Sequence, residues 1–104
     1  MMRQRDLPMK IMAIGTLNAP LTPEQRQQIM PKEVPHTLEL YLDGKIEQFW
    51  FRADTGPIFL MTADSVEEAK ATVDAMPLVA GGLAKYQFWP VGPLAPLGLL
   101  IKGK

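Results

Sequence analysis

A β-strand carries alternate side chains on opposite faces, and two stretches of this sequence sort their residue types in that way. They are IEQFWFR at residues 46–52 and AKYQFWPVG at residues 84–92. One face of each would carry phenylalanine or tyrosine, and the other tryptophan with glutamine and cations. Tryptophan stacks on flat molecules, amides hydrogen-bond to them, and a guanidinium binds a carboxylate. The candidate substrate-binding residues are Gln48, Trp50, Arg52, Gln87 and Trp89.

Arg52 allows two interpretations, which predict opposite results for its replacement by leucine. As a substrate-binding residue, Arg52 would hold a ligand carboxylate, and the variant would lose affinity for anionic ligands but keep its stability. As a structural residue, it would pair with Asp54 or Glu47 near the end of the strand, and the variant would be less stable. The sequence leaves both interpretations open.

His36 is the single histidine, and histidine is the side chain whose ordinary pKa suits proton transfer near neutral pH. Glu39 follows it by three residues and Glu33 precedes it by three, so a helix would bring both carboxylates within reach. The candidate catalytic residues are His36 and Glu39. The alternative is an exposed histidine, because the apolar stripe that includes Val34 and Leu38 is expected to face the core from the opposite side of that helix.

The composition is that of an ordinary globular protein and argues against several partners. The 104 residues suffice for one domain over residues 1–104, with a loose leader at 1–8 and an apolar tail at 93–104 that is expected to pack on another element or another subunit. The 11 lysines and arginines balance 11 acidic residues. This balance gives no electrostatic reason to expect nucleic acid or an anionic membrane as a partner.

Cysteine is absent from the sequence. Disulfides, thiolate nucleophiles and cysteine metal sites are therefore excluded, and no histidine–carboxylate cluster has the spacing of metal ligands. We expect neither a metal nor a cofactor. The N-terminal residues lack the apolar core of a signal peptide, and no stretch reaches membrane-spanning length, so a cytoplasmic location is expected.

Hydrophobic periodicity and cap signals predict four strands and two helical regions. Thr22 and Gln25 form a capping box before the first helix, and Pro31 is expected to end or kink that helix because proline has no N–H to donate. The expected strands are residues 9–17, 46–53, 57–62 and 84–92. The expected helices are residues 23–30, a restart over PKEVPHTLELYLDG at 31–44, and residues 65–76.

The order strand, helix, strand, strand, helix, strand is that of the ferredoxin-like split βαβ fold, β-α-β-β-α-β. This α+β fold has a four-stranded antiparallel sheet with helices on one face, so its other face is uncovered. We expect the tryptophan-bearing sides of the strands to form that uncovered face. Two copies would then close into a dimeric α+β barrel around a small-molecule pocket. A homodimer interface without a ligand is the alternative.

The segment FLMTADSVEEAKATVDAMPLVAGGLAKYQFWPVGPLAP resembles the muconolactone isomerase-like branch of the dimeric α+β barrel superfamily, with its YCII-related relatives. The similar features are the acidic turn after Ser65, the helix exit at Met76-Pro77-Leu78, the last strand and the proline-rich tail. The resemblance implies a dimer or larger ring, no cofactor, and a small lactone or aromatic-derived substrate isomerised by removal and return of a proton. The chain departs from those isomerases at PKEVPHTLELYL and at Val79-Ala80-Gly81-Gly82, and no catalytic residue carries over.

Together, the residues and the resemblance predict a small-molecule-binding homodimer, and specifically a cofactor-independent, isomerase-like enzyme that acts by proton transfer. His36 or a carboxylate would move the proton. Two alternatives remain open: a non-catalytic ligand-binding or accessory protein of the same fold, and a cofactor-free oxygenase of phenolic substrates.

Overall fold

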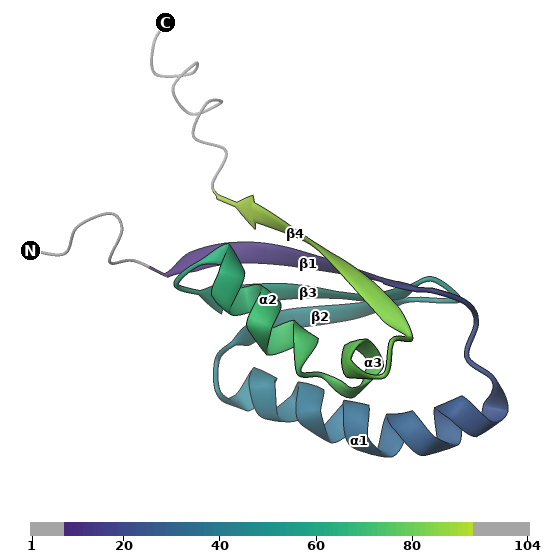
Figure 1. Ribbon diagram of the computed structural model, residues 1–104. Coiled ribbons are helices and arrows are strands. Elements are labelled where there is room, and N and C mark those ends of the chain that lie inside the picture. The colour runs from purple at the N-terminus through teal and green to yellow at the C-terminus, as the bar shows by residue number, and fades with distance from the viewer. Residues whose placement is uncertain (1–7, 93–104) are drawn as a thin grey trace, which may run out of the picture.

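The computed structural model describes residues 8–92, which form a four-stranded antiparallel sheet with its helices on one side (Figure 1). The strands are β1 (Met9–Leu17), β2 (Ile46–Arg52), β3 (Gly56–Ala63) and β4 (Ala84–Val91). The helices are α1 (Pro23–Leu42), α2 (Val66–Asp74) and α3 (Pro77–Ala80). The predicted α+β class and the ferredoxin-like order of strands are confirmed. The predicted tail at 93–104 lies outside this range, and so does the predicted leader at 1–8 apart from Pro8.

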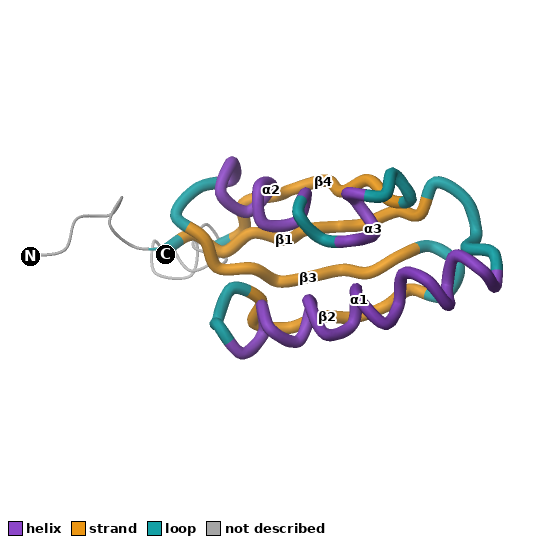
Figure 2. Tube along the Cα trace, turned by 60° about the horizontal axis from the view of Figure 1, so that its bottom comes forward, coloured by secondary structure: helices purple, strands orange, loops and turns teal. Residues whose placement is uncertain are grey.

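The strand order is β2-β3-β1-β4, so β1 and β3 are central while β2 and β4 form the edges. All three neighbouring pairs are antiparallel. Figure 2 shows α1 running along β2 at one edge of the sheet, while α2 lies toward β4 at the other. The helices therefore cover one face of the sheet, and the opposite face carries no element of the described chain.

The start of α1 follows its sequence signals. The Thr22 hydroxyl accepts a hydrogen bond from the Gln25 N–H at 3.1 Å, and the Gln25 side chain accepts one from the Thr22 N–H at 3.0 Å. The predicted end of the first helix at Pro31 is wrong, because α1 is one helix of 20 residues that includes Pro31 and Pro35. Both prolines are exposed. The carbonyls that lose their helical donors therefore lie on the solvent side, where water can bond to them.

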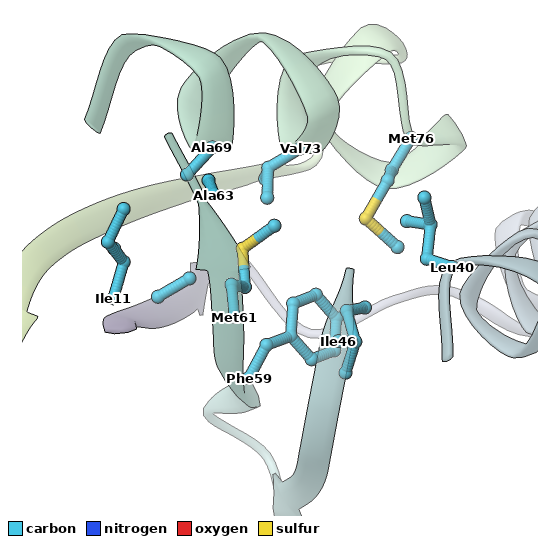
Figure 3. Packing of buried hydrophobic residues seen from close by; sticks show 10 residues of the cluster. Ile11, Leu40, Ile46, Phe59, Met61, Ala63, Ala69, Val73 and Met76 are labelled. Atoms are coloured by element: carbon cyan, nitrogen blue, oxygen red, sulfur yellow. The ribbon is translucent and has the colours of Figure 1, made fainter. Parts of the chain in front are cut away.

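The core lies between the sheet and the helices. Figure 3 shows Val73 and Met76 pointing toward the sheet, with Met61 and Phe59 opposite them. Leu40 of α1 closes this cluster from the side of β2. The cluster of buried apolar residues consists of Ile11, Ala13, Leu40, Ile46, Phe59, Met61, Ala63, Ala69, Val73 and Met76.

The face that α1 turns toward the sheet differs from the predicted one. Leu40 and Glu33 are its buried residues, whereas Val34 and Leu38 are 50% and 46% exposed. His36 is half-buried rather than fully exposed. The expectation that the Val34–Leu38 stripe faces the core is therefore wrong. Glu33 and Leu40 lie two helical turns apart on one face. Because one of these two residues is a glutamate, the pattern of apolar residues does not identify this face as the buried one.

Candidate functional site

An apolar groove of about 380 Å³ lies between α1 and the β2–β3 edge of the sheet. Its lining includes Phe49, Phe51 and Phe59 from the strands and Leu78 from α3. Phe49 and Phe51 stand on the helical side of the edge strand, where α1 covers them only in part. Glu33 is the one ionisable side chain among the described residues that line the groove. A concave apolar site with one polar group is typical of small-molecule binding.

Glu33 projects from the middle of α1 and is 5% exposed. Its Oε1 accepts a hydrogen bond of 3.0 Å from the backbone N–H of Leu78, in the first turn of α3. Burial raises the pKa of the Glu33 carboxyl, and the Leu78 hydrogen bond and the charge of His36 oppose this rise without cancelling it. A carboxyl with a raised pKa can both accept and return a proton closer to neutral pH.

Tyr86 of β4 stacks on Phe59, one of the residues that line the groove, with the ring centroids 5.7 Å apart. Its hydroxyl is buried and has no hydrogen-bond partner in the described part of the chain. Burial, and then the charge of Glu33, raise the pKa of Tyr86, so the phenol stays protonated. A Cβ at Gly15 would come within 2.6 Å of Tyr86 Cζ, so the ring needs glycine at that position.

The two predicted catalytic residues lie on α1 near this groove but are not among its lining residues. His36 is half-buried one turn after Glu33, and Glu39 is exposed. Their catalytic roles stay predictions. In the sequence, Glu33 stands out only as a neighbour of His36. Its position two turns before Leu40, on the sheet-facing row, is the signal that could have identified it.

Four of the predicted substrate-binding residues occupy the corners of the helix-free face of the sheet. Two rows of opposed residues cross this face, and we call them together the open face. The first row is Gln48, Leu60, Met12 and Trp89, and the second is Trp50, Ile58, Ile14 and Gln87. The tryptophans take two diagonal corners and the glutamines the other two. Trp50 is also one of the residues that line the groove. Whether these four side chains bind a substrate stays a prediction.

Arg52, the fifth of these residues, is engaged with the backbone of the sheet. Its Nη2 donates a hydrogen bond of 2.6 Å to the carbonyl oxygen of Gly15, across the end of β3. The β1–β3 register, continued by one residue, sets Gly15 opposite Pro57. Because proline has no N–H, the guanidinium supplies the donor that the ladder cannot.

Replacing Arg52 with leucine should lower the free energy of unfolding by about 1–3 kcal/mol, because a buried carbonyl loses its donor. Urea unfolding of the wild type and the variant measures this loss. The salt-bridge partners suggested by the sequence do not account for it, because Glu47 pairs with Lys10 and no ion pair joins Arg52 to Asp54 in the described part of the chain. Arg52→Lys is the control that keeps the positive charge and loses the guanidinium. Unchanged stability together with weaker binding of anionic ligands would favour the substrate-binding interpretation.

Replacing Glu33 with glutamine should stabilise the protein relative to the wild type as the pH rises. A carboxyl whose pKa is raised by folding contributes its full stability below the ordinary pKa and loses it as the pH rises through the raised pKa. Glutamine has no such titration, and its amide oxygen can still accept from Leu78. Thermal melts from about pH 4 to about pH 7 measure the difference. A difference that stays constant with pH would contradict the prediction.

The chain matches no protein-family model and no curated protein. Within residues 8–92, no three histidine, cysteine, aspartate or glutamate side chains are grouped so that they could hold a metal ion. No helix in the same range is long and apolar enough to cross a membrane.

Proposed function

We propose that the protein is a cofactor-independent enzyme that moves a proton within a small, largely apolar substrate bound in the groove under α1. One observation carries the proposal: a buried carboxyl, that of Glu33, lines a groove that is otherwise apolar or uncharged. Its raised pKa supports the assignment of an acid–base role. The reaction class agrees with the isomerase-like activity that the resemblance implies.

In this proposal, ionised Glu33 removes a proton from the carbon that lies between a ketone or lactone carbonyl and a carbon–carbon double bond of the substrate. The electron pair of the C–H bond forms a new C=C bond, and the carbonyl oxygen takes the negative charge as an enolate. The protonated carboxyl then returns the proton to another carbon of the conjugated system, and the carbonyl forms again. The double bond has moved and no atom or electron has been gained or lost, so no co-reactant is needed.

Deuterium exchange tests the role of Glu33. In deuterated water, the wild-type protein should accelerate exchange of the hydrogens next to the carbonyl in uncharged ketones and lactones, followed by NMR. Glu33→Gln should reduce that acceleration by about 100- to 10,000-fold, because an amide cannot accept the proton. Glu24→Gln is the matched control, since Glu24 is an exposed carboxylate on the same helix.

Several outcomes would overturn this proposal. Loss of exchange in His36→Gln or Glu39→Gln, with normal exchange in Glu33→Gln, would return the chemistry to the residues predicted from the sequence. Binding of the same compounds without exchange in the wild type would indicate a non-catalytic ligand-binding protein. Oxygen uptake with a phenol and no reaction with a lactone would indicate an oxygenase.

The proposal includes a homodimer formed through the open face. Four aliphatic residues fill the centre of this face, and Trp50 and Trp89 at its corners are 47% and 56% exposed. Such an apolar surface is typical of an interface. A twofold axis in the plane of the sheet, along or across the strands, would bring each tryptophan over a glutamine of the partner, which makes the face self-complementary.

Light scattering at micromolar concentration tests the dimer separately from the chemistry. We expect the mass of two chains. The mass of one chain at that concentration would rule out the dimer and leave the Glu33 assignment standing, because the described groove is built from residues of one chain.

A further inference from the structure

A second hollow, of about 340 Å³, continues the groove toward the N-terminal part of α1. The two hollows share Met30, Phe51 and Leu78 in their linings, so they meet there. Arg26 and Asp54 line the second hollow. The combined groove is therefore elongated, apolar where its two parts join, and polar at one end.

The length of this groove follows from the spacing of residues on α1. Arg26, Met30 and Glu33 succeed one another by about one turn, so they lie on one face of the helix. Two turns separate Arg26 from Glu33, which corresponds to about 10 Å along the helix axis. A molecule that reaches both residues must therefore be extended.

The part of the groove beside Glu33 and the part beside Arg26 differ in the charge that they accept. Beside Glu33, none of the described lining residues is a lysine or an arginine, so a carboxylate there would be repelled and would lack a partner. At the other position, the guanidinium of Arg26 can pair with a ligand carboxylate. Asp54 at the same end disfavours more than one negative charge.

We infer that the groove takes an elongated monocarboxylic acid, with its uncharged reactive end at Glu33 and its carboxylate at Arg26, about 10 Å away. This inference rests on the proposed function for the identity of the reactive end. It adds the length of the substrate, the number of its charges and the residue that recognises the charge.

Calorimetric titration with three probes tests the inference. Phenyloctanoate, which carries its carboxylate at the end of an alkyl chain, should bind at least about tenfold more tightly than benzoate, because its chain buries additional methylene groups. Arg26→Gln should weaken the binding of phenyloctanoate by about twofold to fivefold, which is the effect of losing an exposed ion pair. It should leave the affinity for the uncharged phenyloctanol unchanged. Equal affinity for benzoate and phenyloctanoate would overturn the inference.

Three further variants locate the charge effect. Asp54→Asn should strengthen phenyloctanoate binding, and asparagine tolerates the positive φ of 61° at this position. Lys32→Gln on α1 and Lys85→Gln on the other side of the sheet should leave the affinity unchanged, because neither residue lines the groove. If either lysine variant weakens binding as Arg26→Gln does, the inference is wrong.

Failure of the proposed function would give a different result from failure of this inference. If deuterium exchange persists in Glu33→Gln while the binding of phenyloctanoate depends on Arg26, the proton-transfer role falls and the ligand class stands. If exchange of uncharged ketones depends on Glu33 while Arg26→Gln weakens the binding of phenyloctanoate and phenyloctanol equally, the proton-transfer role stands and the ligand class falls.

Discussion

Gly56→Ala should cost the protein about 2–6 kcal/mol of stability, a large share of what a domain of this size has. Gly56 begins β3 with a φ of 148°, which side chains rarely adopt. A Cβ there would come within 2.5 Å of the Gly15 carbonyl oxygen and 3.3 Å of the Thr16 Cα. Both are backbone atoms of β1, so no change of rotamer relieves the contact. Chemical denaturation measures the loss.

Gly44→Ala separates the two causes of this loss. Gly44 also has a positive φ, of 80°, but a Cβ at that position would meet nothing within 4 Å. We therefore expect a loss of only about 1 kcal/mol, from the backbone conformation alone. Equal losses in the two variants would show that β1 and β3 do not approach each other as closely as described.

Phe59→Ala should destabilise the protein by about 3–5 kcal/mol, the usual cost of removing a buried aromatic ring. Phe59 is 2% exposed, belongs to the core, and lines the groove from the β3 side. The variant would lose the stacking contact with Tyr86 and leave a cavity open to the groove. Thermal unfolding measures the effect, and benzene in the buffer should restore part of the stability by filling the cavity.

Phe51→Ala is the matched control for the same residue type on the same side of the sheet. Phe51 is 66% exposed, so its removal should cost less than about 1 kcal/mol. A loss in Phe51→Ala as large as that in Phe59→Ala would mean that something outside the described residues covers the edge strand. Both variants are also informative for ligand binding, because both rings line the groove.

The strands and their faces could be predicted from the sequence because the information is local. Alternation along β2 and β4 separates Phe49 and Tyr86 from Trp50 and Trp89, and the register puts the two sets on opposite sides of the sheet. The caps at Thr22 and Ser65 are also local, since each hydroxyl bonds to an N–H three residues later. The proposed pairing with a second copy would involve another chain, so one sequence does not encode it locally.

The groove could not be predicted because it depends on which face of α1 meets the sheet. Apolar residues lie on several sides of α1, and the most apolar stripe is the half-exposed one with Val34 and Leu38. A buried glutamate opposes the hydrophobic pattern and becomes tolerable only when the Leu78 N–H is brought to it from 45 residues away. No spacing rule within the helix reveals that contact.

The two prolines of α1 have a consequence for how the helix opens. Neither Pro31 nor Pro35 has an amide hydrogen, so the middle of the helix lacks the two hydrogen bonds that these positions would donate to the carbonyls of residues 27 and 31. The segment before Pro31 can therefore unwind while the segment after Pro35, anchored by buried Leu40, stays folded. Amide hydrogens of residues 26–30 should exchange with solvent sooner than those of residues 37–42. Since Arg26 and Met30 line the groove, the residence time of a ligand would follow the fraying of this short segment and not the unfolding of the sheet.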